Sequence, residues 1–173
     1  MQKEIEYCSC CGGKLTGRYE RVSKGLALSL LKFREQILSQ SELAGKLVNK
    51  VHLSKDLKLS KNEYNNFQKL RYHGLIAHYK NKETKEYETG YWLLTSRGNL
   101  FCKNELAVPK KLLIFRNKIE ERSEEKITLE NVLKNDDIPV WYKREDFRED
   151  FSVPFENVND YEEDTDDNQL SMF

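Results

Sequence analysis

Two stretches decide the fold: Phe67-Gln-Lys-Leu-Arg-Tyr-His-Gly-Leu-Ile76 and Gly90-Tyr-Trp-Leu-Leu-Thr-Ser-Arg-Gly98. The first carries apolar residues at helical spacing up to Gly74, a residue type that favours the left-handed conformation at a helix end. The period then changes, because Leu75 to Lys80 and Tyr87 to Leu94 are strand-like and a polar loop joins them. This pattern predicts a β-hairpin with a flexible tip. The Thr-Ser-Arg-Gly that ends the second stretch predicts the start of a short helix.

The segment before these stretches predicts a first amphipathic helix. Ser23 is a suitable N-cap, and the apolar residues after it recur at spacings of four, three and four, which places them on one face. This apolar stripe consists of Leu26, Leu30, Phe33 and Ile37. Residues 41–51 then predict a loop or a short second element, and residues 54–57 predict a helical turn.

A further helix should lead into the first of the two stretches. Ser60-Lys-Asn-Glu63 matches the Ser-x-x-Glu capping box, in which each end residue's side chain bonds a backbone amide of the other. We expect this helix to run from Lys61 to Tyr72 and to bury Tyr64, Phe67 and Leu70. The order helix, helix, helix, two-stranded hairpin is that of a winged helix, an elaborated helix-turn-helix.

The two stretches also resemble the winged-helix cores of bacterial transcription regulators. In those proteins the recognition helix ends in an apolar Gly-Leu-Ile turn, and the second wing strand leads into a Leu-Thr-x-x-Gly helix start. More narrowly, the Cys-x-x-Cys-Gly at Cys8–Gly12, the Lys-Gly-Leu-Ala at Lys24–Ala27 and the Val-Pro-Lys at Val108–Lys110 resemble a family of largely uncharacterised phage proteins. This resemblance covers about residues 8 to 116 and implies a fold, but no activity.

The fold class expected from these patterns is α+β, with a winged helix-turn-helix core at residues 20–108 behind a cysteine-bearing head at residues 1–19. Residues 109–146 predict an extension. In it, Leu112 to Phe115 and Lys126 to Leu129 should form a second small hairpin, followed by a helical turn at Glu130 to Lys134. Residues 147–173 are acidic and rich in asparagine, which predicts a disordered acidic tail.

The formal net charge of zero hides a division along the chain. Residues 1–144 contain 28 Lys and Arg against 18 Asp and Glu, a net charge of +10. Residues 145–173 contain one Arg against 11 acids, a net charge of −10. Such asymmetry is typical of a body that faces nucleic acid and carries an acidic tail. A solvated charged surface is the alternative for the body alone.

The predicted recognition helix carries residue types that suit DNA. If Tyr64, Phe67 and Leu70 face the core, the opposite face presents amides that can bond adenine edges and cations that can reach guanine or phosphate. The hairpin would add lysines suited to phosphates. The candidate DNA-binding residues are Lys61, Asn62, Asn65, Gln68, Lys69, Arg71, Lys80, Lys82 and Lys85. The alternative is an ordinary polar helix face, because winged helices also dock proteins.

The N-terminal cysteines predict half of a zinc site. Cys8 and Cys11 have the spacing of a zinc knuckle, and Gly12 lets backbone amides turn toward a thiolate sulfur. A structural zinc takes four ligands, and a second Cys-x-x-Cys pair is absent from the sequence. A reduced thiol cluster and an intersubunit site are the alternatives to zinc. The candidate ligands are Cys8, Cys10, Cys11 and Cys102, with His52, His73 or His78 as alternative fourth ligands.

The last five residues resemble the bacterial sliding-clamp binding motif, whose usual form is Gln-Leu-(Ser or Asp)-Leu-Phe. They are Gln169, Leu170, Ser171, Met172 and Phe173. Met172 replaces the usual Leu. Burying Leu170, Met172 and Phe173 in apolar subsites would contribute roughly 4 to 9 kcal/mol before ordering costs, while Gln169 makes polar contacts at the edge. The alternative is an apolar anchor that packs back on its own domain.

Several function classes are disfavoured. No nucleophile–base–acid set or phosphate-binding glycine loop is visible, so we expect no catalytic residues and no enzyme. No segment reaches the roughly 18 apolar residues of a membrane span, and the first residues carry acids without an apolar core, unlike a secretory signal. We therefore expect a cytoplasmic protein, in the host cell if it is encoded by a phage.

The expected function is that of a non-enzymatic, phage-type DNA-binding accessory protein that docks on a bacterial or phage sliding clamp. It would act in replication or in clamp-coupled transcription. Two alternatives stay open. One is a promoter-binding transcriptional regulator whose tail binds another protein, and the other is a clamp-binding inhibitor of host replication that does not bind DNA.

Overall fold

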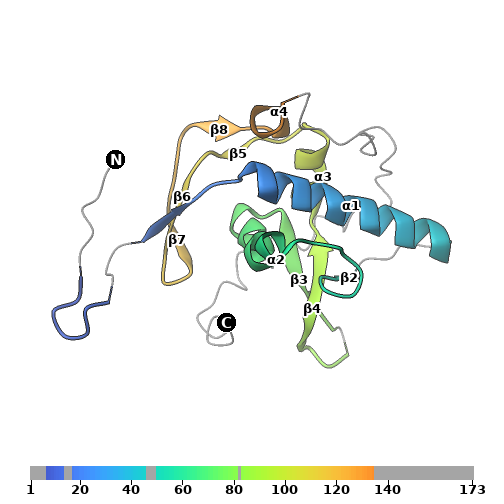
Figure 1. The fold of residues 1–173 in the computed structure, drawn as a ribbon, viewed down its shortest axis with the longest axis horizontal. Coiled ribbons are helices and arrows are strands. Elements are labelled where there is room, and N and C mark those ends of the chain that lie inside the picture. The colour runs from blue at the N-terminus through green and yellow to red at the C-terminus, as the bar shows by residue number, and fades with distance from the viewer. Residues whose placement is uncertain (1–6, 14–16, 46–49, 82, 135–173) are drawn as a thin grey trace.

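The computed structural model describes residues 7–13, 17–45, 50–81 and 83–134, and these residues combine helices with small antiparallel sheets (Figure 1). In chain order the elements are β1 (Arg18–Glu20), α1 (Lys24–Ala44), β2 (Val51–His52), α2 (Lys61–Phe67), the 3-10 helix η1 (Gln68–His73), β3 (Ile76–Lys80), β4 (Tyr87–Leu94), α3 (Ser96–Cys102), β5 (Val108–Pro109), β6 (Leu112–Phe115), β7 (Lys118–Arg122), β8 (Lys126–Ile127) and α4 (Leu129–Val132).

Helix α1 crosses the middle of the molecule in Figure 1, with β5, β8 and α4 above it and α2, β2, β3 and β4 below it. It begins where the sequence predicts, because the Leu26 amide donates to the Ser23 hydroxyl oxygen at 3.3 Å. The predicted apolar stripe is buried. The helix continues to Ala44, beyond the predicted loop start at residue 41, and ends at Gly45 with φ +63°. No helix in the described part of the chain is long and apolar enough to cross a membrane.

Helix α2 forms the predicted capping box. The Ser60 amide donates to the Glu63 carboxylate at 2.8 Å, and the Glu63 amide donates to the Ser60 hydroxyl oxygen at 3.2 Å. Phe67 and Leu70 are fully buried, but Tyr64 is 48% exposed, so its predicted burial is wrong. After Phe67 the helix tightens to η1, whose three residues per turn align Leu70 with Phe67. In the wider α-helical turn before Phe67, Tyr64 lies about 60° around the helix axis from Phe67.

The predicted hairpin of β3 and β4 is confirmed. Strand β2 joins it, and the sheet order is β2-β4-β3, with Ile76 opposite Leu94 and Val51 opposite Trp92. The inner face of this sheet packs on the helices through aromatic rings. The Phe67 ring lies 5.3 Å from the Phe33 ring of α1 and 6.3 Å from the Trp92 ring of β4.

The two stretches that decide the fold meet at Thr95. Its hydroxyl donates to the Gly74 carbonyl oxygen at 2.6 Å and accepts from the Gly98 amide at 3.0 Å. The Thr95 amide also donates to the Leu75 carbonyl oxygen at 3.2 Å. One residue thereby caps α3 and fixes the left-handed turn that ends η1, where Gly74 has φ +73°.

The second predicted hairpin is wrong in its pairing. Strand β6 pairs with β7, whereas β8 pairs with β5. The reason is the turn after β6, where Arg116 and Asn117 have φ of 49° and 63° and form a two-residue hairpin loop. Strand β1, which lies across the expected boundary between residues 19 and 20, pairs with the other edge of β6. The N-terminal strand and the extension therefore share the sheet β1-β6-β7.

Gly98 is required by the close approach of α3 to the turn after Gly74. A Cβ atom on Gly98 would collide with the Leu75 carbonyl oxygen. We predict that Gly98→Ala lowers the free energy of unfolding by about 2 kcal/mol or more, because backbone must move to admit the methyl group. Thermal unfolding followed by circular dichroism measures this change.

Gly25→Ala is the matched control. A Cβ atom at Gly25 has no neighbour closer than the Ser23 hydroxyl oxygen at 3.9 Å, and Gly25 lies in the first turn of α1. This variant should be as stable as the wild type or more stable by up to about 1 kcal/mol. Equal stability of the two variants would contradict the role given to Gly98.

Candidate nucleic-acid interface

The exposed face of α2 carries the first group of predicted DNA-binding residues. Lys61, Asn62 and Asn65 are all exposed, on the side of the helix away from the buried Phe67. The Asn66 side-chain amide donates to the Asn62 carbonyl oxygen at 2.7 Å, so this amide is occupied within the helix. Lys61 and Asn65 are thus exposed to solvent, and the exposed Asn62 also lines the cleft between α2 and β1.

Gln68 and Lys69 lie at the side of the helix and are partly buried. The Lys69 ammonium lies 3.5 Å from the Glu20 carboxylate, which also pairs with the Arg18 guanidinium at 2.7 Å. Glu20 is buried, so this contact fixes the helix to β1. The charge of Lys69 is therefore partly offset by its own chain, whereas Lys61 forms no ion pair with an acid in the described part of the chain.

Arg71 is committed to contacts within the protein. Its Nη2 donates to the Tyr72 hydroxyl at 3.1 Å, and its Nη1 lies 3.5 Å from Nε2 of His78. The Tyr72 hydroxyl donates in turn to Oδ1 of Asn117 at 3.2 Å. Burial and the Arg71 charge lower the pKa of His78 to about 4, so its ring is neutral near pH 7. The end of the helix is therefore bonded both to β3 and to the β6–β7 turn.

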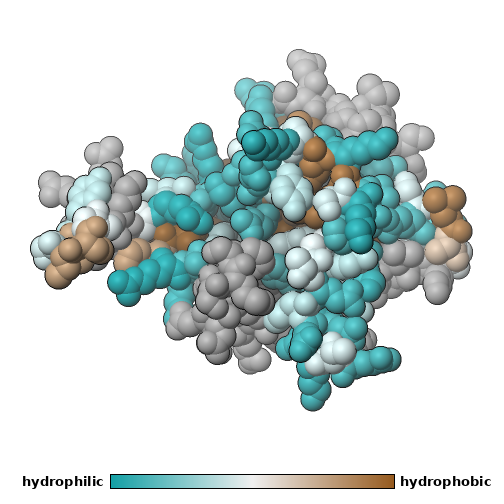
Figure 2. Space-filling model, turned by 60° about the horizontal axis from the view of Figure 1, so that its bottom comes forward, coloured by the Kyte–Doolittle hydropathy of each residue, from teal (hydrophilic) through white to brown (hydrophobic). Residues whose placement is uncertain are grey.

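The β3–β4 hairpin carries the remaining candidates. Lys80 is exposed, with its ammonium 5.3 Å from the centre of the Tyr87 ring. Lys85 is exposed at the tip and has φ 59°. Lys82 lies outside the described residues. Figure 2 shows that hydrophilic side chains cover most of the visible described surface on this side of the molecule.

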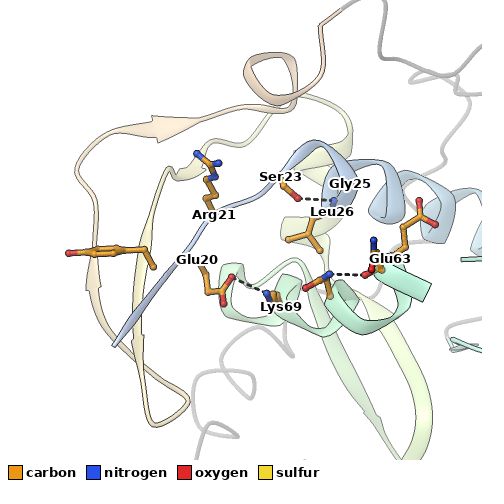
Figure 3. A pocket seen from close by; sticks show the side chains of 10 residues that line it. Glu20, Arg21, Ser23, Gly25, Leu26, Glu63 and Lys69 are labelled. Atoms are coloured by element: carbon orange, nitrogen blue, oxygen red, sulfur yellow. Dashed lines mark hydrogen bonds and ion pairs between the residues drawn. The ribbon is translucent and has the colours of Figure 1, made fainter. Parts of the chain in front are cut away.

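A cleft of about 430 Å³ separates α2 from β1 and the start of α1 (Figure 3). Its walls carry both signs of charge, from Glu20, Arg21, Glu63 and Lys69. Two of these charges are paired across the cleft wall by the Glu20–Lys69 contact.

The N-terminal cysteines form a tight turn. The Gly12 amide donates to the Cys8 carbonyl oxygen at 2.9 Å, and the Cys10 amide donates to the Cys8 sulfur at 3.4 Å. Bonds from the backbone amides of Cys10 and Cys11 lower the pKa of the Cys8 thiol. These bonds stabilise a thiolate, the form in which cysteine binds metals.

The other candidate metal ligands lie elsewhere. Cys102 is fully buried in the core, where burial raises its pKa to about 12. His52, His73 and His78 belong to β2, η1 and β3, whereas Figure 1 shows the turn of residues 7–13 projecting away from these elements. Among the described residues, no group of three or more His, Cys, Asp or Glu side chains is placed to hold a metal ion. Zinc at this turn stays a prediction that needs further ligands.

The predicted clamp-binding peptide, Gln169, Leu170, Ser171, Met172 and Phe173, lies outside the described residues, as does the whole acidic tail. Tyr72 and Asn117, which join the helix to the second sheet, were not predicted as site residues. The Arg-Asn pair after an apolar strand was an available signal for Asn117, because Asn is favoured in two-residue hairpin loops.

No family model, no curated protein and no solved structure matches this chain. Any functional assignment therefore rests on the residues and the geometry described above.

The cysteines should differ strongly in reactivity. We predict that a metal-free sample treated with iodoacetamide near pH 7 is alkylated fastest at Cys8, because its thiol has a lowered pKa. Cys102 should react only after unfolding, because its thiol is buried and has a raised pKa. Peptide mass spectrometry measures both rates. Alkylation of Cys102 in the folded protein at the rate of Cys8 would contradict this prediction.

Proposed function

We propose that this protein is a non-enzymatic DNA-binding accessory protein of the winged-helix type that docks on a DNA sliding clamp through its C-terminal peptide. The observation that carries the proposal is the arrangement around α2. The chain runs α1, β2, α2 with η1, β3 and β4, and the sheet order is β2-β4-β3. This is the order expected of a winged helix, with the turn at residues 53–56 in place of the middle helix.

The chemistry of the surface supports DNA as a ligand. Asn62 and Asn65 are exposed on α2 and have the side chain that bonds adenine edges in a major groove. Lys61, Lys80 and Lys85 are exposed beside them and suit backbone phosphates. The net charge of +10 on residues 1–144 would draw the protein to DNA over longer range.

The C-terminal peptide supports the clamp as a partner. Its apolar side chains match the subsites of the clamp motif, and it follows an acidic segment whose charge is opposite to that of residues 1–144. Two modest contacts joined by one chain raise each other's effective concentration. With its body on DNA and its tail on the clamp that encircles the same DNA, the protein would therefore form a more stable complex than through either contact alone. Recruitment in replication, clamp-coupled transcription and occupation of the host clamp all fit this arrangement.

One observation favours a second candidate, in which α2 docks a protein. Tyr64 is 48% exposed on α2, and tyrosine is enriched in protein interfaces. The two candidates differ in their dependence on salt, because displacement of counterions from DNA phosphates gives a steep loss of affinity. A flat response of DNA binding to salt would favour the protein-docking candidate.

Substitutions on α2 test DNA binding. We predict that Lys61→Ala weakens binding to all duplexes and reduces the slope of log affinity against log salt by about 0.9, the value for one phosphate contact. Asn65→Ala should instead reduce the preference between sequences, by about 1 to 3 kcal/mol. Fluorescence anisotropy with labelled duplexes measures both effects.

Lys126→Ala is the control, because Lys126 is an exposed lysine on β8, away from α2 in Figure 1. It removes the same charge and should leave the slope unchanged. If Lys61→Ala and Lys126→Ala behave alike, α2 is not the surface that contacts DNA.

Deletion of residues 169–173 tests clamp binding. We predict that the full chain is retained by an immobilised clamp, from the host or from a phage, and that the deletion variant is lost. Phe173→Ala should weaken binding, since it removes the largest apolar side chain of the peptide. Met172→Leu, which restores the usual motif, should bind at least as tightly. Equal retention of the full and deleted chains, or retention of neither, would sink the clamp proposal.

A further inference from the structure

We propose that the β6–β7 turn is a second DNA-binding element, in which Arg116 and Lys118 contact backbone phosphates on the flank of α2 opposite the β3–β4 hairpin. This inference rests on the proposed DNA-binding function and extends it to a part of the chain outside the winged-helix core. Its ligand is the same duplex that α2 would contact.

The turn is held beside the predicted recognition helix by specific contacts. The Tyr72 hydroxyl donates to Oδ1 of Asn117 at 3.2 Å. The Tyr72 ring packs in a small buried cluster with Leu112 and Ile114, and Ile119 packs against it. These contacts join the last turn of η1 to both strands of the hairpin. The turn is therefore placed by the helix and not only by its own sheet.

The backbone of the turn adds an independent observation. Arg116 has φ 49°, in the left-handed region where glycine and asparagine are the usual residues. Asn117, at φ 63°, suits this conformation and bonds Tyr72. Arg116 does not suit it, so a cation occupies a strained position. Lys85 at the tip of the β3–β4 hairpin has φ 59°, so both hairpins place a cation in the same unfavoured conformation.

The charges along the second hairpin suit a contact through its turn. Arg116 and Lys118 are exposed at the turn. Glu120 is exposed two residues beyond Lys118 on the same face of β7, and the acids Glu121, Glu124 and Glu125 lie toward the other end of the hairpin. No acid in the described part of the chain forms an ion pair with Arg116. Its guanidinium lies 5.1 Å from the centre of the Phe115 ring, a contact that leaves the N–H groups able to donate to a phosphate.

The two hairpins are arranged for one ligand. Figure 1 shows the β3–β4 and β6–β7 turns pointing to the same edge of the molecule, on either side of α2. Arg71 connects the two sides, because its guanidinium reaches His78 in β3 and the Tyr72 hydroxyl that bonds Asn117. Arg71 is therefore a positioning residue. It sets the hairpins relative to the helix, and they would contact phosphates on both flanks of the groove that α2 enters.

The experiment compares two double variants of the full chain by fluorescence anisotropy on one duplex, at salt concentrations from about 50 to about 200 mM. The turn variant is Arg116→Ala with Lys118→Ala. The control is Arg122→Ala with Lys126→Ala, which removes two exposed cations from the opposite end of the hairpin and from β8. All four residues are exposed, and circular dichroism confirms that each variant folds.

We expect the turn variant to lose two phosphate contacts, which reduces the salt slope by about 1.8. When salt rises from about 50 to about 200 mM, the affinity of the wild type should fall by a factor about 12 times larger than the factor for the turn variant. The control should keep the wild-type slope. Asn117→Gly keeps the left-handed turn and the charges but removes the bond from Tyr72, so it should weaken binding with less change in slope.

The outcomes separate this inference from the proposed function. If the turn variant binds with the wild-type affinity and slope while Lys61→Ala loses affinity, the second element is wrong and the role of α2 stands. If the turn variant and the control lose equal affinity and equal salt slope, the effect is one of net charge, and the second element is again overturned. If the wild type itself does not bind duplex DNA, the proposed function and this inference fall together.

Discussion

The described structure depends on the two hydrogen bonds of the Thr95 hydroxyl. One bond holds the carbonyl oxygen of Gly74, where η1 ends, and the other caps the amide of Gly98, where α3 begins. Thr95 is buried, so its loss would leave a buried acceptor and a buried donor without partners, each at a cost of about 1 to 3 kcal/mol. Because Thr95 directly follows β4, the same bonds set the wing against the helix. The orientation of the proposed DNA-binding surface follows from this junction.

A second set of contacts connects that surface to the rest of the chain. Arg71, Tyr72 and Asn117 form a line of side-chain contacts from the end of η1 to the β6–β7 turn. Lys69 and Glu20 make a parallel connection to β1. Polar side chains of the helix are thus divided between two uses. Those near its start face solvent and suit a ligand, and those near its end hold the second sheet in place.

The sequence predicted the local structure well, because local structure is determined by residues a few positions apart. The Ser60 capping box, the Ser23 cap and the β3–β4 hairpin each depend on bonds or alternation within one short segment. Two predictions were wrong where the structure depends on residues farther apart in the chain. Tyr64 is 48% exposed, because its place on the helix is set by how α2 packs against the rest of the chain. The second hairpin was given the wrong partner strand because β7 is polar and alternates weakly, whereas the residues of β8 looked equally strand-like.

The sequence alone determined the division of charge between body and tail, the C-terminal peptide with its resemblance to a clamp motif, and the residues available for DNA on α2. These are properties of composition and of short motifs, which need no distant partner. Only the tertiary structure decided that Arg71 and Lys69 are held within the protein, that Cys102 is buried apart from the other cysteines, and that Arg116 lies beside the proposed recognition helix. Such facts depend on contacts between residues far apart in the chain. One sequence pattern is compatible with many different sets of long-range contacts, and the packing of the core selects among these sets.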